Sequence, residues 1–195
     1  MEKLSRDDLY TLEAYAEKRK EFRTRVMEHK KNRRLAIGPN ATLYFEDRLT
    51  IQYQIQEMLR IEKVFEAEGI EDELQAYNPL VPDGSNWKAT FMLEFEDADE
   101  RRRQLSKLVG IESCVWMKVD GNKLITPIYN EDLERSTEDK TSSVHFMRFE
   151  LTPEDVKALK EENADISAGI SHELYNYTVS PVPAEIRNSL VEDLD

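Results

Sequence analysis

One predicted β-strand carries three side chains that could move a proton or bind an anion. In Val144–Leu151, His145 lies on one face, and Arg148 and Glu150 lie on the other, because side chains alternate along a strand. A histidine there could act as a general acid or base, and an arginine could bind an anion in a cleft. A histidine among apolar neighbours can equally be a hydrogen-bonded core residue, so both interpretations stay open.

Further polar side chains lie in the helix predicted over residues 47–68 and in the segment after it. With about 100° of rotation per residue, Arg48 and Gln52 line the edge of an apolar arc. Tyr77 and Asn78 follow at the start of a turn-rich loop. A small-molecule-binding protein or an enzyme would need these side chains and those of the strand to converge on one cleft. That cleft would be lined by Arg48, Gln52, Tyr77, Asn78, His145, Arg148 and Glu150.

The sequence offers little to hold a metal or a cofactor. His145, His172 and Glu150 could together bind a divalent cation, but neither a spaced histidine pair nor a Glu-x-x-His motif supports this. His172 is kept as a further candidate ligand-binding residue. The single cysteine, Cys114, excludes a four-cysteine zinc site and a cysteine-ligated iron–sulfur cluster. Since the chain has 6 glycines and no glycine-rich phosphate loop, we expect no metal and no cofactor.

A buried ion pair is predicted between the first two helices. Glu62 lies near the centre of the apolar arc of the second helix, where an unpaired carboxylate would be costly. Arg19 and Arg23 lie within the apolar arc of the first helix. We expect Glu62 to pair with Arg19 or Arg23 in the interior. The alternative is that these charged groups reach the rim of the helix interface.

The charge of the chain bears on its partners and its location. The net charge is −13, which opposes binding to nucleic acid or to an anionic membrane surface. Basic residues gather in Lys18–Arg34, and a basic helix of this kind can bind anions, remain solvated or pack on the acidic remainder of the chain. The sequence has no apolar run long enough for a membrane span and no secretory signal in Met1–Tyr10, so we expect a cytoplasmic protein.

Periodicity and turn residues predict the elements that must position these side chains. Helices are expected from Ser5 to about Lys31, from Asp47 to about Glu68, and over Glu71–Tyr77, Asp97–Leu108, residues 153–162 and Pro183–Leu194. Strands are expected at Arg34–Ile37, Thr42–Phe45, Trp87–Glu96, Val115–Val119, Asn122–Ile128, Val144–Leu151 and Tyr175–Val179, with a polar loop over Asn130–Ser143.

This order of elements predicts an α+β fold. Two long N-terminal helices precede a mostly antiparallel sheet, and we expect helices to pack on one face of that sheet. The chain reads as a single domain over 1–195, with a helical subregion and a short hairpin in 1–77 and an α+β sheet region in 78–195. Because the second helix is apolar on two sides, we also expect a homodimer.

Four strings of the sequence together resemble a known family. They are HKKNRR (His29–Arg34), FEDRLTIQYQIQEMLRIEKVFE (Phe45–Glu66), AYNPLVPDGSNWKATFMLEF (Ala76–Phe95) and EDKTSSVHFMRFELTP (Glu138–Pro153). Their order and spacing are similar to those of the bacterial family catalogued as domain of unknown function 3501, over nearly the whole chain. That family has no established activity. Its genes lie near those for rubrerythrin and an iron–sulfur oxidoreductase, so the resemblance implies a supporting role in peroxide or redox metabolism, with one of these proteins as partner.

Two functions of different classes therefore follow from the sequence. The first is a non-catalytic accessory of a cytoplasmic redox or peroxide-response system that acts through protein contacts. The second is a small-molecule-binding protein or enzyme that uses the cleft listed above. One feature distinguishes the two hypotheses. The second requires the start of the second helix and the His145 strand to meet at one pocket, and the first does not.

Overall fold

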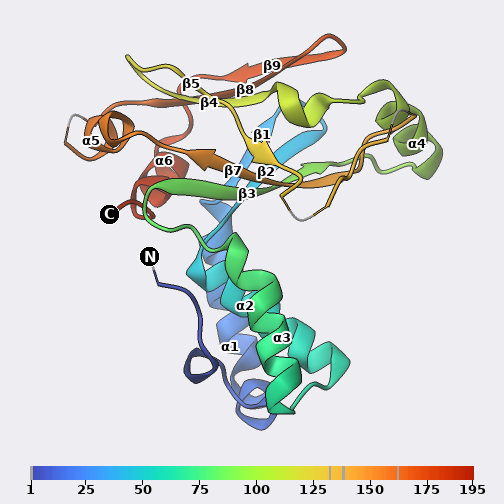
Figure 1. Cartoon of the computed structure of the whole chain (residues 1–195), viewed down its shortest axis with the longest axis vertical. Helices are drawn as coiled ribbons and strands as arrows, with labels where there is room; N and C mark the ends of the chain where they lie inside the picture. The colour runs from blue at the N-terminus through green and yellow to red at the C-terminus, as the bar shows by residue number, and fades with distance from the viewer. Residues whose placement is uncertain (1, 132, 138, 162) are drawn as a thin grey trace.

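A computed structural model describes residues 2–131, 133–137, 139–161 and 163–195. Figure 1 shows two stacked β-sheets with a three-helix unit extending from one side. The helices are α1 (Leu12–Lys31), α2 (Arg48–Glu62), α3 (Ala67–Tyr77), α4 (Ala98–Lys107), α5 (Pro153–Glu161) and α6 (Ala184–Val191). The strands are β1 (Arg34–Ile37), β2 (Ala41–Glu46), β3 (Asn86–Leu93), β4 (Val115–Val119), β5 (Leu124–Ile125), β6 (Ile128–Tyr129), β7 (Val144–Glu150), β8 (Ile166–His172) and β9 (Tyr175–Val179). The predicted helix end at Glu162, and residues 132 and 138 of the predicted loop, lie outside the described residues.

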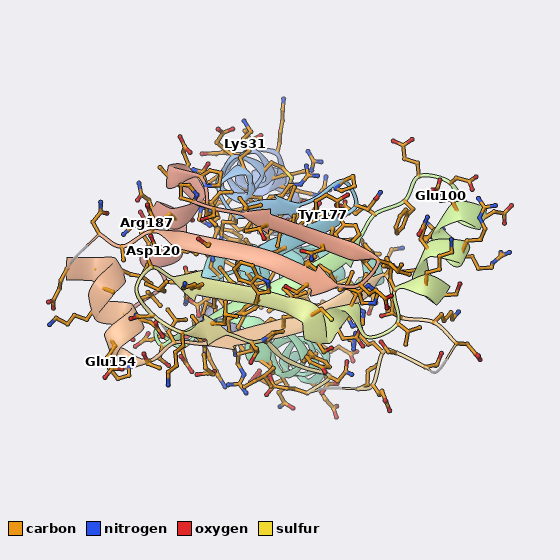
Figure 2. All side chains as sticks on the ribbon, turned by 90° about the horizontal axis from the view of Figure 1, so that it is seen from above. Lys31, Glu100, Asp120, Glu154, Tyr177 and Arg187 are labelled. Carbon is orange, nitrogen blue, oxygen red and sulfur yellow. The ribbon has the colours of Figure 1, made fainter. Side chains whose placement is uncertain are left out.

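The α+β fold class is confirmed, and the sheet region consists of two antiparallel sheets. Their strand orders are β1-β2-β3-β7-β6 and β5-β4-β8-β9. Apolar side chains from both sheets form one core, which includes Trp87, Phe149 and Ile170. Seen from above in Figure 2, the four-stranded sheet crosses the other, with α4 and α5 at opposite ends. A second sheet, not a layer of helices, therefore covers the apolar face of the first.

The second sheet includes a strand that the sequence pattern did not indicate. In β8 the first five residues, 166–170, are all buried, so this strand lacks the polar alternation used to recognise half-buried strands. The hairpin predicted over Val115–Val119 and Asn122–Ile128 is wrong in its second strand, which is divided between the two sheets. Only Leu124–Ile125 pairs with β4, whereas Ile128 pairs with Arg148 in the other sheet. The segment between them therefore links the two sheets.

Both N-terminal helices are shorter than their periodicity indicates. Ser5 and Asp8 cap each other around a single 3-10 turn, after which the chain is extended, and α1 starts only after the Thr11 cap. Asp47 caps α2 by accepting a hydrogen bond from the Thr50 amide at 2.8 Å. The helix ends because Lys63 adopts a left-handed conformation with φ of 57°. The predicted extension of α2 to Glu68 is therefore wrong.

A buried arginine joins the helical unit to the sheets. Arg33, which follows α1, donates through Nε to the Phe45 carbonyl at 3.0 Å and through Nη2 to the Glu46 carbonyl at 3.1 Å. Its Nη1 donates to the Ser189 carbonyl at 3.2 Å, and its Nη2 lies 2.5 Å from an Asp193 carboxylate oxygen. Two segments of the chain, 45–46 and 189–193, are thereby held at one guanidinium, which belongs to a residue that is 2% exposed.

We predict that Arg33→Met destabilises the protein by about 3–5 kcal/mol, because it leaves buried carboxylates without their cation. Urea unfolding followed by circular dichroism measures the change in the free energy of unfolding. The neighbouring Arg34 is exposed, so Arg34→Met is the matched control and should change stability by less than about 0.5 kcal/mol. Equal effects of the two substitutions would contradict the central role of Arg33.

Candidate functional site

Three of the predicted ligand-binding side chains bind the N-terminal segment of the same chain, residues 4–10. Arg48 Nη2 lies 2.5 Å from a carboxylate oxygen of Asp8, and Gln52 donates to the Asp8 carbonyl at 2.5 Å. The Asn78 amide donates to the Leu4 carbonyl and accepts from the Leu4 amide, each at 2.8 Å. These side chains thus form hydrogen bonds with backbone groups, and an ion pair with one carboxylate, of their own chain.

Gln56 completes this contact and was missed from the sequence. It accepts a hydrogen bond from the Tyr10 amide at 2.5 Å and donates to the Tyr10 carbonyl at 3.3 Å, and it is fully buried. Arg48, Gln52 and Gln56 are spaced four residues apart, so they form one polar row on α2. That spacing was the available signal for Gln56.

His145 lies in the core between the two sheets. Its Nε2 lies 2.9 Å from the Thr141 hydroxyl and 3.1 Å from the Ser142 carbonyl. Thr141 in turn donates to the buried Glu112 carboxylate at 3.1 Å. Burial lowers the pKa of His145, which favours the neutral ring. This position fits the core interpretation of His145 and gives it no access to the opposite face of β7, where Arg148 lies.

Arg148 and Glu150 lie on the outer face of β7 and contact each other. Arg148 also makes a two-pronged ion pair with Glu131, with distances of 3.0 Å from Nε and 2.6 Å from Nη2. Glu150 accepts a further hydrogen bond from Asn86 at 3.1 Å. The hydrogen bonds that Arg148 donates to Glu131 and Glu150 raise its pKa, so its charge is permanent and already compensated within the chain.

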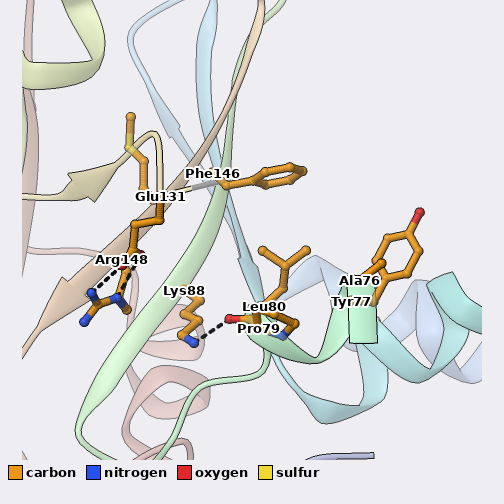
Figure 3. A pocket seen from close by; sticks show the side chains of 9 residues that line it. Ala76, Tyr77, Pro79, Leu80, Lys88, Glu131, Phe146 and Arg148 are labelled. Atoms are coloured by element: carbon orange, nitrogen blue, oxygen red, sulfur yellow. Dashed lines mark hydrogen bonds and ion pairs between the residues drawn. The ribbon is translucent and has the colours of Figure 1, made fainter. Parts of the chain in front are cut away.

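A cavity of about 470 Å³ beside this ion pair brings together Arg148 and Tyr77. It lies between the end of α3 and the outer face of β3 and β7, as Figure 3 shows. Lys88 enters it and donates to the Pro79 carbonyl at 2.5 Å. Burial lowers the pKa of this lysine. The cavity is lined by Ala76, Tyr77, Pro79, Leu80, Lys88, Glu131, Phe146, Met147 and Arg148.

His172 lies apart from this cavity and from His145. Its Nδ1 accepts from the Leu174 amide at 3.2 Å, and its Nε2 lies 3.3 Å from the Val109 carbonyl. Within the described ranges of the chain, no group of three His, Cys, Asp or Glu side chains is placed to hold a metal ion. The seven residues of the expected cleft are therefore divided among the N-terminal contact, the core, the outer face of β7 and the end of α3, where Tyr77 lies.

The expected ion pair has a different acidic member. Arg19 pairs with Glu57, through distances of 2.8 Å from Nε and 2.9 Å from Nη2, and Tyr15 donates to the same carboxylate at 2.7 Å. Glu62 and Arg23 are exposed, so the pairing of Glu62 with Arg19 or Arg23 is wrong. Glu62 is the last residue of α2.

The two apolar sides of α2 are both covered within the chain. One side, with Ile51 and Ile55, packs on α3 and on Leu4 of the N-terminal segment. The other side, with Tyr53, packs on Phe22 of α1. The two-sided pattern that motivated a homodimer is thus explained by intrachain packing.

The described helices include none with the length and hydropathy needed to cross a bilayer.

The fold and its separated polar groups define an α+β protein with a three-helix unit attached to two stacked antiparallel sheets. The chain belongs to the family described as protein of unknown function (DUF3501), whose sequence model matches residues 3–194. A crystal structure of a protein of unknown function from Burkholderia pseudomallei is similar, with 48% identity and a TM-score of 0.93 over 100% of both chains. No curated protein matches this sequence.

We predict that Glu57→Met destabilises the protein by about 1 kcal/mol, because a partly exposed ion pair and a tyrosine hydrogen bond are lost. The hydrogen bond from Arg19 holds the pKa of Glu57 at about 2, below its usual 4.5. The stabilisation of the folded protein by ionised Glu57 is therefore present above about pH 4.5 and is lost as the pH falls toward 2. Chemical unfolding at several pH values measures it. Glu62→Met is the matched control, and a larger loss from that variant would contradict the assignment.

We also predict that Gln56→Leu loosens the N-terminal segment, because the Tyr10 amide and carbonyl lose a bidentate partner. Hydrogen exchange followed by mass spectrometry should show faster exchange in residues 4–10, with the sheets unchanged. Gln75 is exposed on α3, so Gln75→Leu serves as the control. Unchanged exchange in the Gln56 variant would show that the segment is held by other contacts.

Proposed function

We propose that this protein is a non-catalytic accessory of a cytoplasmic redox or peroxide-response system and acts through protein contacts. One observation carries the proposal: the side chains suited to chemistry are dispersed and hydrogen-bonded within the chain. Arg48 holds Asp8, His145 is enclosed in the core, and Arg148 holds Glu131. Catalysis requires such groups to converge on one reacting atom.

A contact surface is available at the end of the helical unit farthest from the sheets (Figure 1). Ile61 is 60% exposed and Phe65 is 71% exposed. Val64 and Ile70 are partly buried and line one surface pocket together with Phe65. We call these four residues the apolar tip. Large exposed apolar side chains grouped together are typical of protein interaction sites. The tip therefore supports a function exerted through contact with another protein.

The resemblance of the sequence implies the partner, a rubrerythrin or an iron–sulfur oxidoreductase. A homodimer through the apolar tip is a further proposal, since burial of α2 within the chain leaves only its end uncovered. Nucleic acid and anionic membranes do not fit as partners, because the net charge of −13 repels both.

A second candidate function is the binding of a small molecule, and the cavity beside Arg148 favours it. Its volume of about 470 Å³ falls in the range typical of ligand pockets. It is not the cleft expected from the sequence, because only Tyr77 and Arg148 of the seven expected residues line it. Its other charged residues, Lys88 and Glu131, were not among the candidates.

The leading proposal predicts that replacing the exposed side chains of the tip abolishes partner binding without unfolding the protein. The variant Ile61→Ser with Phe65→Ser should bind purified rubrerythrin or the iron–sulfur oxidoreductase of the same cell at least about tenfold more weakly than the original chain. Isothermal titration calorimetry measures both affinities, and analytical ultracentrifugation reports any homodimer in the same samples.

The control is Leu174→Ser, because Leu174 is 62% exposed in the turn between β8 and β9, which belong to the sheet that lies away from the helical unit (Figure 1). Equal affinity of the tip variant and the original chain would remove the tip from the interaction. Failure of both redox proteins to bind the original chain at micromolar concentrations would overturn the accessory role.

A further inference from the structure

Two cationic side chains face the same cavity from adjacent strands. Lys88 of β3 and Arg148 of β7 are directly opposite in the antiparallel register. Both lie on the outer face of the sheet and line the cavity beside α3. Like charges at directly opposed positions destabilise a sheet unless anions compensate them. Their shared position therefore requires negative charge nearby, which Glu131 and Glu150 supply in the free protein.

The two cations are compensated unequally. Arg148 contacts two carboxylates, Glu131 and Glu150. Lys88 has a carbonyl as its hydrogen-bond acceptor, that of Pro79, and the described residues place no ion-pair partner within 4 Å of its amine, so the charges of Asp83 and Glu131 act on it only from farther away. An ammonium group has three donors, so Lys88 retains donors for an additional acceptor. An anion placed between Lys88 and Arg148 would contact both.

One of the two carboxylates that contact Arg148 is suited to leave it. Glu131 comes from the segment after β6, and its side chain is 52% exposed, whereas that of Arg148 is 27% exposed. Since half of the Glu131 side chain already contacts solvent, its carboxylate regains water at little cost when it leaves Arg148. Glu150 lies on β7 itself and would stay in contact with the arginine. Glu131 is therefore the replaceable member of the cluster.

The rest of the cavity is apolar. Figure 3 shows Phe146 and Leu80 between the charged end and Tyr77. A second cavity of about 440 Å³ shares Tyr77, Leu80 and Phe146 with the first, but Lys30 and Glu46 also line it. The apolar wall beyond the cations therefore belongs to the first cavity, which we call the groove. Such a lining fits a molecule with a charged head and an apolar body.

We propose that this groove binds a small carboxylate with an apolar body. The carboxylate displaces Glu131 and lies between Arg148 and Lys88, while the body lies along Leu80 and Phe146. The proposal rests on the second candidate function, since it names the ligand class of that cavity. Glu131 acts in the free protein as an internal competitor that keeps Arg148 compensated.

Isothermal titration calorimetry on the intact protein tests this, with octanoate as the probe and octanamide as its neutral analogue. Octanoate is expected to bind at least about tenfold more tightly than octanamide, because only the carboxylate places a negative charge against the two cations. Arg148→Met and Lys88→Met should each weaken octanoate binding by about tenfold. Glu131→Gln should strengthen it severalfold, because the competing carboxylate is gone. Lys123→Met, an exposed lysine after β4, is the control and should leave binding unchanged.

The outcomes separate this inference from the function on which it rests. Equal binding of octanoate and octanamide would overturn the carboxylate proposal but leave a small-molecule site in place. Unchanged octanoate binding in Arg148→Met would also overturn it. Absence of binding by either probe would overturn the proposal and the second candidate function together. Circular dichroism of each variant shows whether it is folded. If Arg148→Met unfolds, Glu131→Gln gives an independent test, because it removes no cation.

Discussion

The guanidinium of Arg33 is the interaction on which the arrangement of this protein depends. It lies where the chain passes from the helical unit to the first strand, and its donors are used by Phe45, Glu46, Ser189 and Asp193. A buried charge without such partners is strongly unfavourable. The first strands, the start of α2 and the C-terminal segment must therefore be in place together. Removing any one of them would leave Arg33 with fewer of its buried partners.

Two carboxylates share this cation, and their pKa values move in opposite directions. Burial alone would raise the pKa of Asp47, but the hydrogen bond with His29 and the charge of Arg33 outweigh it and lower that pKa. Burial raises the pKa of Asp193 to about 6, against the opposing charge of Arg33. Since the folded-state pKa of Asp193 is raised, its contribution to stability is largest at low pH and is lost as the pH rises toward 6. Because Asp47 also caps α2, the same network fixes where that helix begins.

The elements that could be predicted from sequence are those whose signals are local. The alternation after Trp87 and the Asp47 cap each depend on residues within one turn or one strand, and both were found. The end of α2 was missed because Lys63 takes a left-handed conformation without the glycine that usually marks one. β8 was missed because burial of residues 166–170 on both faces erases alternation. The second sheet follows from pairing between strands distant in sequence, which periodicity does not contain.

The candidate site shows the same division between local and non-local information. Helical spacing located polar side chains in an apolar setting on α2, but it did not reveal that their partner is the backbone of residues 4–10. A row such as Arg48, Gln52 and Gln56 satisfies a peptide segment as well as it would a ligand. Lys88 was passed over because a lysine on the polar face of a strand is ordinary in sequence. Its significance arises only from the register that places it opposite Arg148. Polar residues found by periodicity therefore indicate where a partner is needed, and the tertiary structure decides whether the chain itself provides that partner.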